Sequence, residues 1–237
     1  MLNDLIKEPF MGFDKKAFTF LRALKDPKKN NKEWFDANRD TYEEYLKKPM
    51  RDLIDYLAVE IRKIDPDIVV NYKSIFRINR DIRFSKDKSP YKTKLSAAFA
   101  FGRVKSSEIP QFYFHFGPDD FVIASGQYSS DPQMLKKIRK GIYQNFDRYL
   151  EIISDKKFKK EYSIIDGDTL TRLPKEYSNL EKSGADIRLM EALKMKQWYV
   201  WKDADKKLTL DNRMTDIIID QIKLSYDFTK FLHEISK

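Results

Sequence analysis

The chain has 237 residues and a formal net charge of +9, from 46 Lys or Arg side chains against 37 Asp or Glu. Its 41% hydrophobic content and 17 Phe side chains are enough for a packed core, which excludes an intrinsically disordered chain. The sequence has no Cys, so disulfides, thiolate catalysis and Cys-ligated metals are excluded, and with only two His we expect no metal site.

The length of the chain suits one large domain, and the sequence shows no linker, repeat or low-complexity tract. We therefore predict a single domain over residues 1–237. Residues 1–12 lack the basic and apolar segments of a signal peptide. No apolar run approaches the roughly 20 residues that span a bilayer. We expect a cytoplasmic protein with no membrane partner; the sequence indicates neither a cofactor nor an oligomeric state.

Residues 1–65 are expected to be mainly helical. Asp14 is positioned to cap the N-terminus of a first helix, and Asn31 that of a second. Pro49 suits the first turn of a third helix, where its missing N–H costs no hydrogen bond. Apolar residues recur at helical spacing after each of these starts, so three amphipathic helices should precede the rest of the fold.

After Pro66 the apolar pattern changes to a period of two, which is typical of strands. We expect strands over residues 69–83, 94–101, 111–116 and 121–128. The links 102–110 and 117–120 contain Gly and Pro and suit hairpin loops. Strands joined by hairpins are antiparallel, so this part of the chain should form an antiparallel sheet.

The excess positive charge lies within this strand region. Residues 71–110 hold ten basic against three acidic side chains, which accounts for most of the net charge of +9. As a strand, residues 76–84 would place Arg80 on the same face as Phe76 and Phe84. A guanidinium among apolar side chains is tolerated only when it is paired, so we expect a carboxylate partner for Arg80.

We predict that this basic stretch binds an anionic ligand such as a phosphate-bearing small molecule. Planar guanidinium groups bind phosphate or carboxylate through two hydrogen bonds, while Lys supplies a mobile point charge. Arg77 and Arg83 would clamp the anion. The candidate ligand-binding residues are Arg77, Arg80, Arg83, Lys86, Asp87, Lys88, Tyr91 and Lys92.

Phosphoryl or phosphodiester chemistry at such a clamp would need an acid or a base. In segment 111–116, alternation turns Tyr113 and His115 away from the core, which makes His115 a candidate; the alternative is a hydrogen-bonded sheet histidine. Asp81 is a second candidate, although its cationic neighbours favour an ion pair. The sequence has no Walker A loop, Rossmann glycine pattern, Gly-x-Ser-x-Gly elbow or His-Glu-x-x-His. The reaction class therefore stays open.

Two other interpretations of the basic stretch stay open. In the first, the protein is a non-catalytic nucleic-acid-binding module with phosphate contacts along residues 71–110, and Tyr91 or Phe99 stacks on a base. In the second, the stretch is a lattice of Arg–Asp salt bridges that ties this segment to the N-terminal helices and only maintains the fold.

The C-terminal part of the chain is expected to be mainly helical. Asp131, followed by Pro132, signals a helix start, and Asp211 is positioned to cap one long final helix with an apolar stripe that ends near Ile235. Between them the chain is charged and irregular, and we expect only short helices over 155–162 and 185–194 and short strands over 170–173 and 197–201. The fold class is therefore α+β, with N-terminal helices, a central antiparallel sheet and C-terminal helices.

The basic stretch also carries a spaced motif made of Arg77, Arg80, Asp81, Arg83, Phe84, Asp87, Lys88 and Tyr91. This pattern resembles the signature of the DUF2461 family. Residues 30–35, Tyr42 and Pro49 upstream and residues 173–175 downstream agree with it, so the resemblance spans essentially the whole chain. The family is mainly bacterial and has no established activity. The resemblance implies family membership and a focal motif, without a reaction.

Overall fold

The structure is a computed structural model that describes residues 9–103, 106, 108–162 and 166–237. Residues 1–8, at the start of the segment considered for a signal peptide, lie outside the described residues, as do residues 104, 105 and 107 of the predicted link 102–110. The helices are α1 (Lys15–Ala23), α2 (Lys32–Ala37), α3 (Arg39–Tyr42), α4 (Lys48–Ile64), α5 (Pro132–Gln144), α6 (Phe146–Ser154), α7 (Lys156–Glu161), α8 (Leu180–Ser183), α9 (Ile187–Lys194), α10 (Arg213–Leu224) and α11 (Tyr226–Ile235). The strands are β1 (Ile68–Val69), β2 (Leu95–Phe101), β3 (Gln111–Phe116), β4 (Phe121–Gln127) and β5 (Trp198–Asp203).

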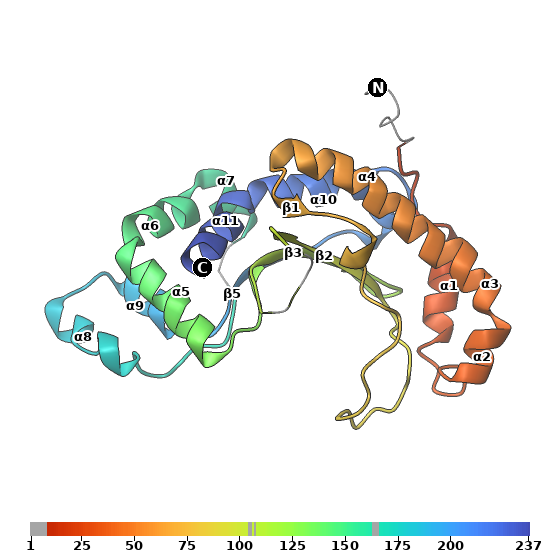
Figure 1. The fold of residues 1–237 in the computed structure, drawn as a ribbon, viewed down its shortest axis with the longest axis horizontal. Coiled ribbons are helices and arrows are strands. Elements are labelled where there is room, and N and C mark those ends of the chain that lie inside the picture. Colours follow the sequence, from red (N-terminus) through yellow and green to blue (C-terminus); the bar gives the residue numbers. More distant parts are fainter. Residues whose placement is uncertain (1–8, 104–105, 107, 163–165) are drawn as a thin grey trace. The chain divides into compact units, whose positions relative to one another are not determined.

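The strands form an antiparallel sheet in the order β1-β2-β3-β4-β5, with helices before and after it in the chain (Figure 1). The predicted α+β fold class is confirmed. Strands β2, β3 and β4 match the predicted segments to within one residue at each end. Strand β1 pairs with β2 through Ile68 opposite Phe101 and Val69 opposite Ala100. Because consecutive strands are neighbours, short connections are sufficient to join them.

The chain falls into two compact units, which we describe separately. The first contains residues 1–104, 113–123 and 203–221, and the second contains residues 105–112, 124–202 and 222–237. The single-domain prediction stays a prediction, because two compact units can still unfold as one cooperative domain. In the part of the chain that the structure describes, no helix has the length and apolar character needed to cross a membrane.

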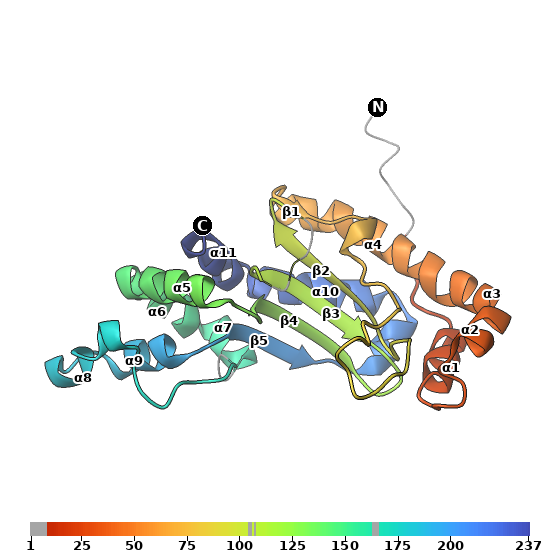
Figure 2. The ribbon, with the colours of Figure 1, turned by 60° about the horizontal axis from the view of Figure 1, so that its bottom comes forward.

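The predicted N-terminal helices are confirmed in the first unit. The Asp14 side chain accepts a hydrogen bond from the backbone of α1, the Asn31 side chain does the same for α2, and Pro49 lies in the first turn of α4. Helix α4 buries one apolar face, and every residue of β2 is buried. In this unit α4 lies on one side of β2 and β3, whereas the loop of residues 76–94 lies on the other side (Figures 1 and 2).

The predicted strand over 69–83 is wrong beyond Val69. Asn71 and Ser74 form a capping box that starts a 3-10 turn, and only single bridges follow, at Ile75 and Asn79. Further on, Asp81 accepts a hydrogen bond from the backbone N–H two residues later, as Asn71 also does. Such local hydrogen bonds compete with the ladder of a sheet, so the segment follows an irregular path.

One consequence of this irregular path concerns Phe84. The strand pattern places its ring on the core face, but the ring is 95% exposed. By contrast, the carboxylate partner expected for Arg80 is present, because the guanidinium forms an ion pair with Asp87. The alternation predicted for β3 is also confirmed: its Phe side chains are buried, and Tyr113 and His115 are only partly buried.

The second unit packs its helices around an apolar cluster that includes Trp198 of β5, Phe228 and Phe231. The predicted cap of α5 is confirmed, since the Asp131 side chain accepts hydrogen bonds from the N–H groups of Gln133 and Met134. Gly126 has a φ of +118°, and a Cβ there would lie 2.2 Å from the carbonyl oxygen of Trp198. Only glycine combines that backbone conformation with so close a contact.

Two predictions for the second unit need correction. Residues 147–200 contain helix α6, and residues 170–173 form no strand. The single final helix is two helices, α10 and α11, with Ser225 between them at φ −96° and ψ 6°. The Ser225 hydroxyl lies 2.8 Å from that of Ser125 on β4. This contact is between distant parts of the chain, and the apolar spacing of the sequence does not reveal it.

Candidate functional site

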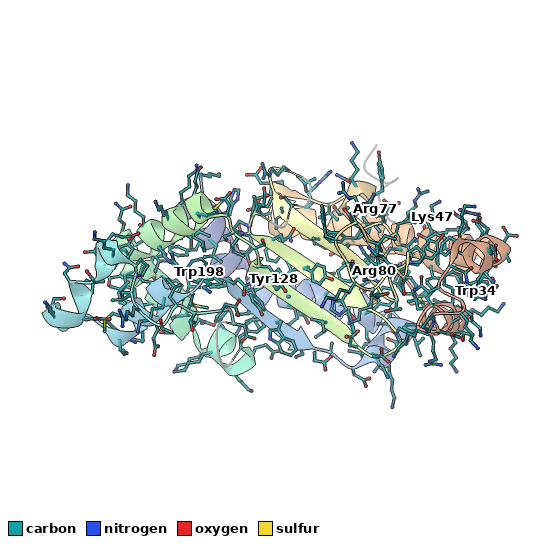
Figure 3. All side chains as sticks on the ribbon, turned by 90° about the horizontal axis from the view of Figure 1, so that it is seen from below. Trp34, Lys47, Arg77, Arg80, Tyr128 and Trp198 are labelled. Carbon is teal, nitrogen blue, oxygen red and sulfur yellow. The ribbon has the colours of Figure 1, made fainter. Side chains whose placement is uncertain are left out.

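The basic segment of residues 76–92, which we call the basic motif, divides into a part that lines a pocket and a part that forms an exposed loop tip. The pocket, which we call the Arg80 pocket, has a volume of about 630 Å³. It is lined by Leu24, Lys25, Asn30, Phe76, Arg80, Asp87, Ser89, Tyr91, Lys92, Thr93, Lys94, Ser96 and Tyr113, all within the first unit. Four of these side chains are cationic and one is a carboxylate. Figure 3 shows Arg77 and Arg80 over the strands on this side of the sheet.

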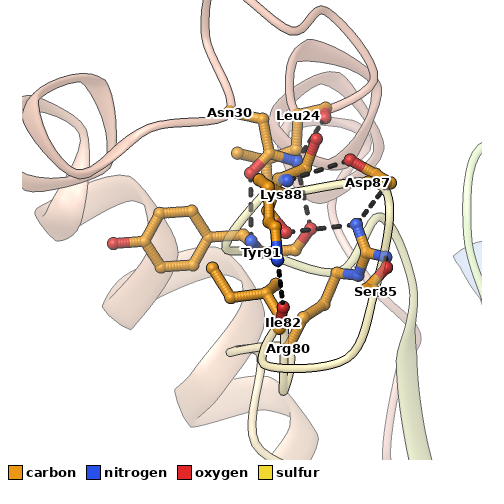
Figure 4. Close-up of polar contacts among 9 residues, drawn as sticks. Leu24, Asn30, Arg80, Ile82, Ser85, Asp87, Lys88 and Tyr91 are labelled. Atoms are coloured by element: carbon orange, nitrogen blue, oxygen red, sulfur yellow. Dashed lines mark hydrogen bonds and ion pairs between the residues drawn. The ribbon is translucent and has the colours of Figure 1, made fainter.

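Arg80 is held in place by acceptors on several sides (Figure 4). Its guanidinium pairs with the carboxylate of Asp87 and donates to the carbonyl oxygen of Ser89 at 3.1 Å and to the hydroxyl of Ser85 at 3.3 Å. Hydrogen bonds from Ser89, together with Arg80, lower the pKa of Asp87 to about 2. Arg80 is thus preorganised, but its charge is already balanced by an ionised carboxylate.

Asn30 fixes the segment that carries Tyr91 into the pocket wall. Its side-chain oxygen accepts from the Tyr91 N–H at 3.0 Å, and its side-chain nitrogen donates to the carbonyl oxygens of Tyr91 at 3.0 Å and Leu24 at 2.7 Å. The Tyr91 ring stacks on Phe35, with 4.1 Å between ring centroids. Tyr91 is therefore a buried wall residue, with 7% of its surface exposed.

The loop tip holds the rest of the motif. Asp81 accepts hydrogen bonds from the side chain and the backbone N–H of Arg83, and these lower the pKa of the carboxyl group. Lys88 donates to the carbonyl oxygen of Ile82 at 3.0 Å, and Lys86 is exposed. None of these side chains lines the Arg80 pocket. The ion pairs at Arg80 and Arg83 are formed within the motif, and not with the N-terminal helices as the salt-bridge lattice would require.

Lys92 differs from the other cations of the pocket. Its ammonium lies 5.4 Å from the centroid of the Phe76 ring, and no ion pair joins it to a carboxylate among the residues that the structure describes. Partial burial and, secondly, the positive charge of Arg77 lower the pKa of Lys92 below its ordinary value. Lys25 and Lys94, by contrast, are paired with Asp119 and Asp120. Lys92 is thus a partly desolvated cation without a counter-charge.

Arg77 faces a second, smaller pocket of about 390 Å³ on the other side of Phe76 and Tyr91. Arg39 and Arg51 also line this second pocket. Within the described ranges, Arg77 forms no ion pair, and its influence on the pKa of Lys92 shows that the two charges are close enough to repel. Besides the hydrogen bonds from Arg83, the charge of Arg77 also lowers the pKa of Asp81, the ion-pair partner of Arg83. Arg77 therefore acts on Lys92 and on the Arg83–Asp81 pair, and the clamp of Arg77 with Arg83 stays a prediction.

His115 lies next to the Arg80 pocket, in contact with two residues of its wall. Its Nε2 is 3.2 Å from Lys94 Nζ, and its Nδ1 is 3.1 Å from the Tyr113 hydroxyl. Burial, followed by the charge of Lys94, lowers the pKa of His115, although Asp120 opposes the shift. Asp81, the other acid–base candidate, lies at the loop tip with Arg83. Across the described residues, no group of three or more His, Asp or Glu is arranged to hold a metal ion.

Several pocket residues were not singled out from the sequence. Lys25 and Asn30 come from the helical N-terminal region. Asn30 belongs to residues 30–35, which agree with the family signature, but no local pattern reveals its contact with Tyr91, 61 residues away. Lys94 and Tyr113 had a signal: both lie at strand positions in or next to predicted strands, and the alternation of β3 turns Tyr113 away from the core. Thus the strand pattern could have added Lys94 and Tyr113, whereas Lys25 and Asn30 required the tertiary structure.

Comparison of the chain with known protein families gives a match. The family model described as "Conserved hypothetical protein (DUF2461)" matches residues 16–231, which is essentially the whole chain. The chain belongs to the DUF2461 family. A search of curated proteins found no match to this DUF2461 protein. Membership therefore confirms the resemblance seen in the motif, and any activity has to be argued from the pocket itself.

Proposed function

We propose that this DUF2461 protein binds a small phosphate-bearing anion in the Arg80 pocket, with Lys92 as the principal charged contact. The observation that carries the proposal is the state of Lys92: partly buried, close to Arg77, and without a carboxylate partner among the described residues. Withdrawing an ammonium group from water and placing it beside another cation costs free energy. A bound anion would offset both costs.

The surrounding residues support the same assignment. Lys25, Lys94 and Arg80 add positive charge around the pocket, and cations gathered in a concave, partly desolvated site raise the local concentration of anions. Thr93 and Ser96 supply hydroxyl groups that can donate to phosphate oxygens, whereas Ser89 already donates to Asp87. The carboxylate of Asp87 opposes binding, because it already occupies the guanidinium of Arg80. We expect the ligand to depend on Lys92 first and on Arg80 second.

The experiment that tests this proposal is a titration of the protein with inorganic phosphate. Calorimetry measures the binding, and thermal unfolding measures the change in Tm. We expect saturable binding and a rise in Tm, because a ligand that binds only the folded state stabilises it. The matched variants are Lys92→Met, which should weaken binding, and Arg83→Met at the loop tip, which should not. Absence of binding by phosphate and by phosphomonoesters would refute the proposal.

Binding measurements with the same variants also distinguish the nucleic-acid alternative from the pocket. A single-stranded oligonucleotide that contacts several phosphates should lose affinity steeply as salt rises, because each contact releases counterions. A phosphate held in one pocket contacts few cations and should respond less. A steep salt dependence together with sensitivity to Arg83→Met and Lys86→Met would favour the nucleic-acid module over the pocket.

A further inference from the structure

Four polar side chains form a connected chain at the wall of the Arg80 pocket. Lys94 and Tyr113 line the pocket, and His115 and Asp120 lie behind them. Tyr113 contacts His115, His115 contacts Lys94, and Lys94 pairs with Asp120. All four belong to the first unit. The proposed anion site uses the Lys94 charge and leaves Tyr113, His115 and Asp120 without an assigned role.

The contacts of His115 define its tautomer. A Lys ammonium group has donors and no acceptor, so Nε2 of His115 must accept the hydrogen bond from Lys94. In a neutral imidazole the other nitrogen then carries the hydrogen. Nδ1–H therefore donates to the Tyr113 hydroxyl oxygen, 3.1 Å away. Burial of the ring is the largest effect on the pKa of the imidazole and lowers it, so the neutral form is favoured. Three charged groups also act on this pKa: Lys94 lowers it, and Asp120 and Asp203 raise it.

Asp120 supports this arrangement from behind. One carboxylate oxygen pairs with Lys94 and lies 3.5 Å from His115 Nε2. The other oxygen is buried and has no hydrogen-bond donor among the described residues. Partial burial raises the pKa of Asp120, but the net shift is downward, chiefly through the hydrogen bond from Lys94, so the group is ionised. An ionised carboxylate with a buried oxygen that lacks a donor within the protein is costly and calls for an explanation.

We propose that Tyr113 is the general acid of a site that hydrolyses a phosphate ester, that it donates its hydroxyl proton to the bridging oxygen of the ester, and that His115, Lys94 and Asp120 position it. In this step the bond between phosphorus and the bridging oxygen breaks, the Tyr113 O–H bond breaks, and the leaving group gains the proton as an alcohol. The phenolate left on Tyr113 accepts the hydrogen bond from His115 Nδ1–H. A water molecule forms the new bond to phosphorus, and the proton that it loses restores the Tyr113 hydroxyl, so no oxidant or reductant is required.

This inference rests on the proposed function, because the ligand that receives the proton is the anion bound beside Lys92. Tyr113 is the residue that touches the ligand. His115 acts through Tyr113, Lys94 fixes the tautomer of His115, and Asp120 holds Lys94. General acids contribute most when they are preorganised by such contacts, and a donor already aimed at the tyrosine oxygen stabilises the phenolate as it forms.

The test is the side-chain ¹H–¹⁵N spectrum of histidine, which is simple because the chain has only two His. The variant His233→Gln identifies the signals of His115. At pH 7 we expect the Nδ1–H tautomer of His115 in the wild-type protein. Lys94→Met should release it to the Nε2–H tautomer, while Lys25→Met, a pocket cation that does not contact His115, should leave it unchanged. An Nε2–H tautomer or an imidazolium in the wild-type protein would overturn the inference.

Inorganic phosphate then separates this inference from the proposed function. We expect phosphate to shift the His115 nitrogen signals in the wild-type protein, and the shift should be lost in Tyr113→Phe and, at the same phosphate concentration, in Lys92→Met. If phosphate binds through Lys92 but leaves His115 unchanged, Tyr113 is not the acid and the proposed function survives. If phosphate changes neither these signals nor Tm, both proposals fail.

Discussion

The two parts of the basic motif have similar compositions and different electrostatic states. At the loop tip, Arg83 is paired with Asp81, and the other cations are exposed to solvent. In the Arg80 pocket, Lys92 is partly withdrawn from water and lacks a partner among the described residues. Exposed cations are screened and contribute little to stability or specificity. The comparison shows that a count of positive charges along a sequence says less about ligand binding than burial and pairing do.

The largest difference between the two parts should appear in stability. Asn30→Ala removes three hydrogen bonds, two to the backbone of Tyr91 and one to that of Leu24, and leaves buried backbone groups unsatisfied. We expect it to lower the free energy of unfolding by about 3 kcal/mol. The matched variant at the tip is Lys88→Met, which removes one exposed hydrogen bond and should change stability by less than about 0.5 kcal/mol. Urea unfolding measures both, and equal losses would contradict the distinction.

The next effect concerns phosphate affinity. Lys92→Met keeps much of the side-chain volume and removes the unpaired charge, so we expect the Kd for inorganic phosphate to rise about tenfold or more, which corresponds to about 1.4 kcal/mol. Arg83→Met should change it less than about twofold, because that charge is balanced by Asp81 at the tip. Isothermal titration calorimetry compares the two. A larger effect at Arg83 would place the anion at the loop tip.

A smaller effect, of opposite sign, is expected from Asp87. The ionised carboxylate of Asp87 occupies the guanidinium of Arg80, so Asp87→Asn should free that guanidinium and lower the Kd for phosphate by about three- to fivefold. Asp81→Asn is the control at the tip and should leave the Kd unchanged. If Asp87→Asn weakens binding instead, Asp87 orients Arg80 for the ligand more than it competes with it.

The smallest effect is a pH dependence. The pKa of His115 is lowered in the folded protein, so between that lowered value and 6.5 the unfolded chain binds a proton that the folded chain does not. Stability from this group is present above 6.5 and is lost as the pH falls through that interval. His115→Asn should make the free energy of unfolding depend less on pH, with a shallower slope, across this interval. Urea unfolding at pH 5 and pH 7.5 checks it, and identical slopes in both proteins would argue against a buried neutral imidazole.

Local patterns in the sequence were sufficient for most of the regular elements. Asp14, Asn31 and Asp131 cap helices as expected, because a cap depends on residues two or three positions away. The strand over 69–83 failed for a reason that was also local. Asn71 and Asp81 each accept a hydrogen bond from the N–H two residues later, and these turns outweigh the β propensity of the aromatic and branched residues around them.

The site was predictable only in part. The expected carboxylate partner of Arg80 is present, although the strand face from which it was inferred is not, since the segment is irregular and Phe84 is exposed. The sequence could not separate the role of Lys92 from that of Lys86 or Lys88, because burial and pairing depend on the path of the loop. The contribution of Asn30 depends on a contact across 61 residues. Such long-range contacts leave no periodicity in a single sequence.

The most direct test of the central claim is a pH titration of the Lys92 ammonium group. NMR of side-chain-labelled lysine monitors it with and without inorganic phosphate. The account predicts a pKa for Lys92 below the ordinary 10.5 in the free protein, a rise in that pKa when phosphate binds, and proton uptake at a pH between the two values. Arg77→Met should also raise it, since Arg77 contributes to the shift. A Lys92 that titrates at its ordinary value and is unaffected by phosphate would contradict the account.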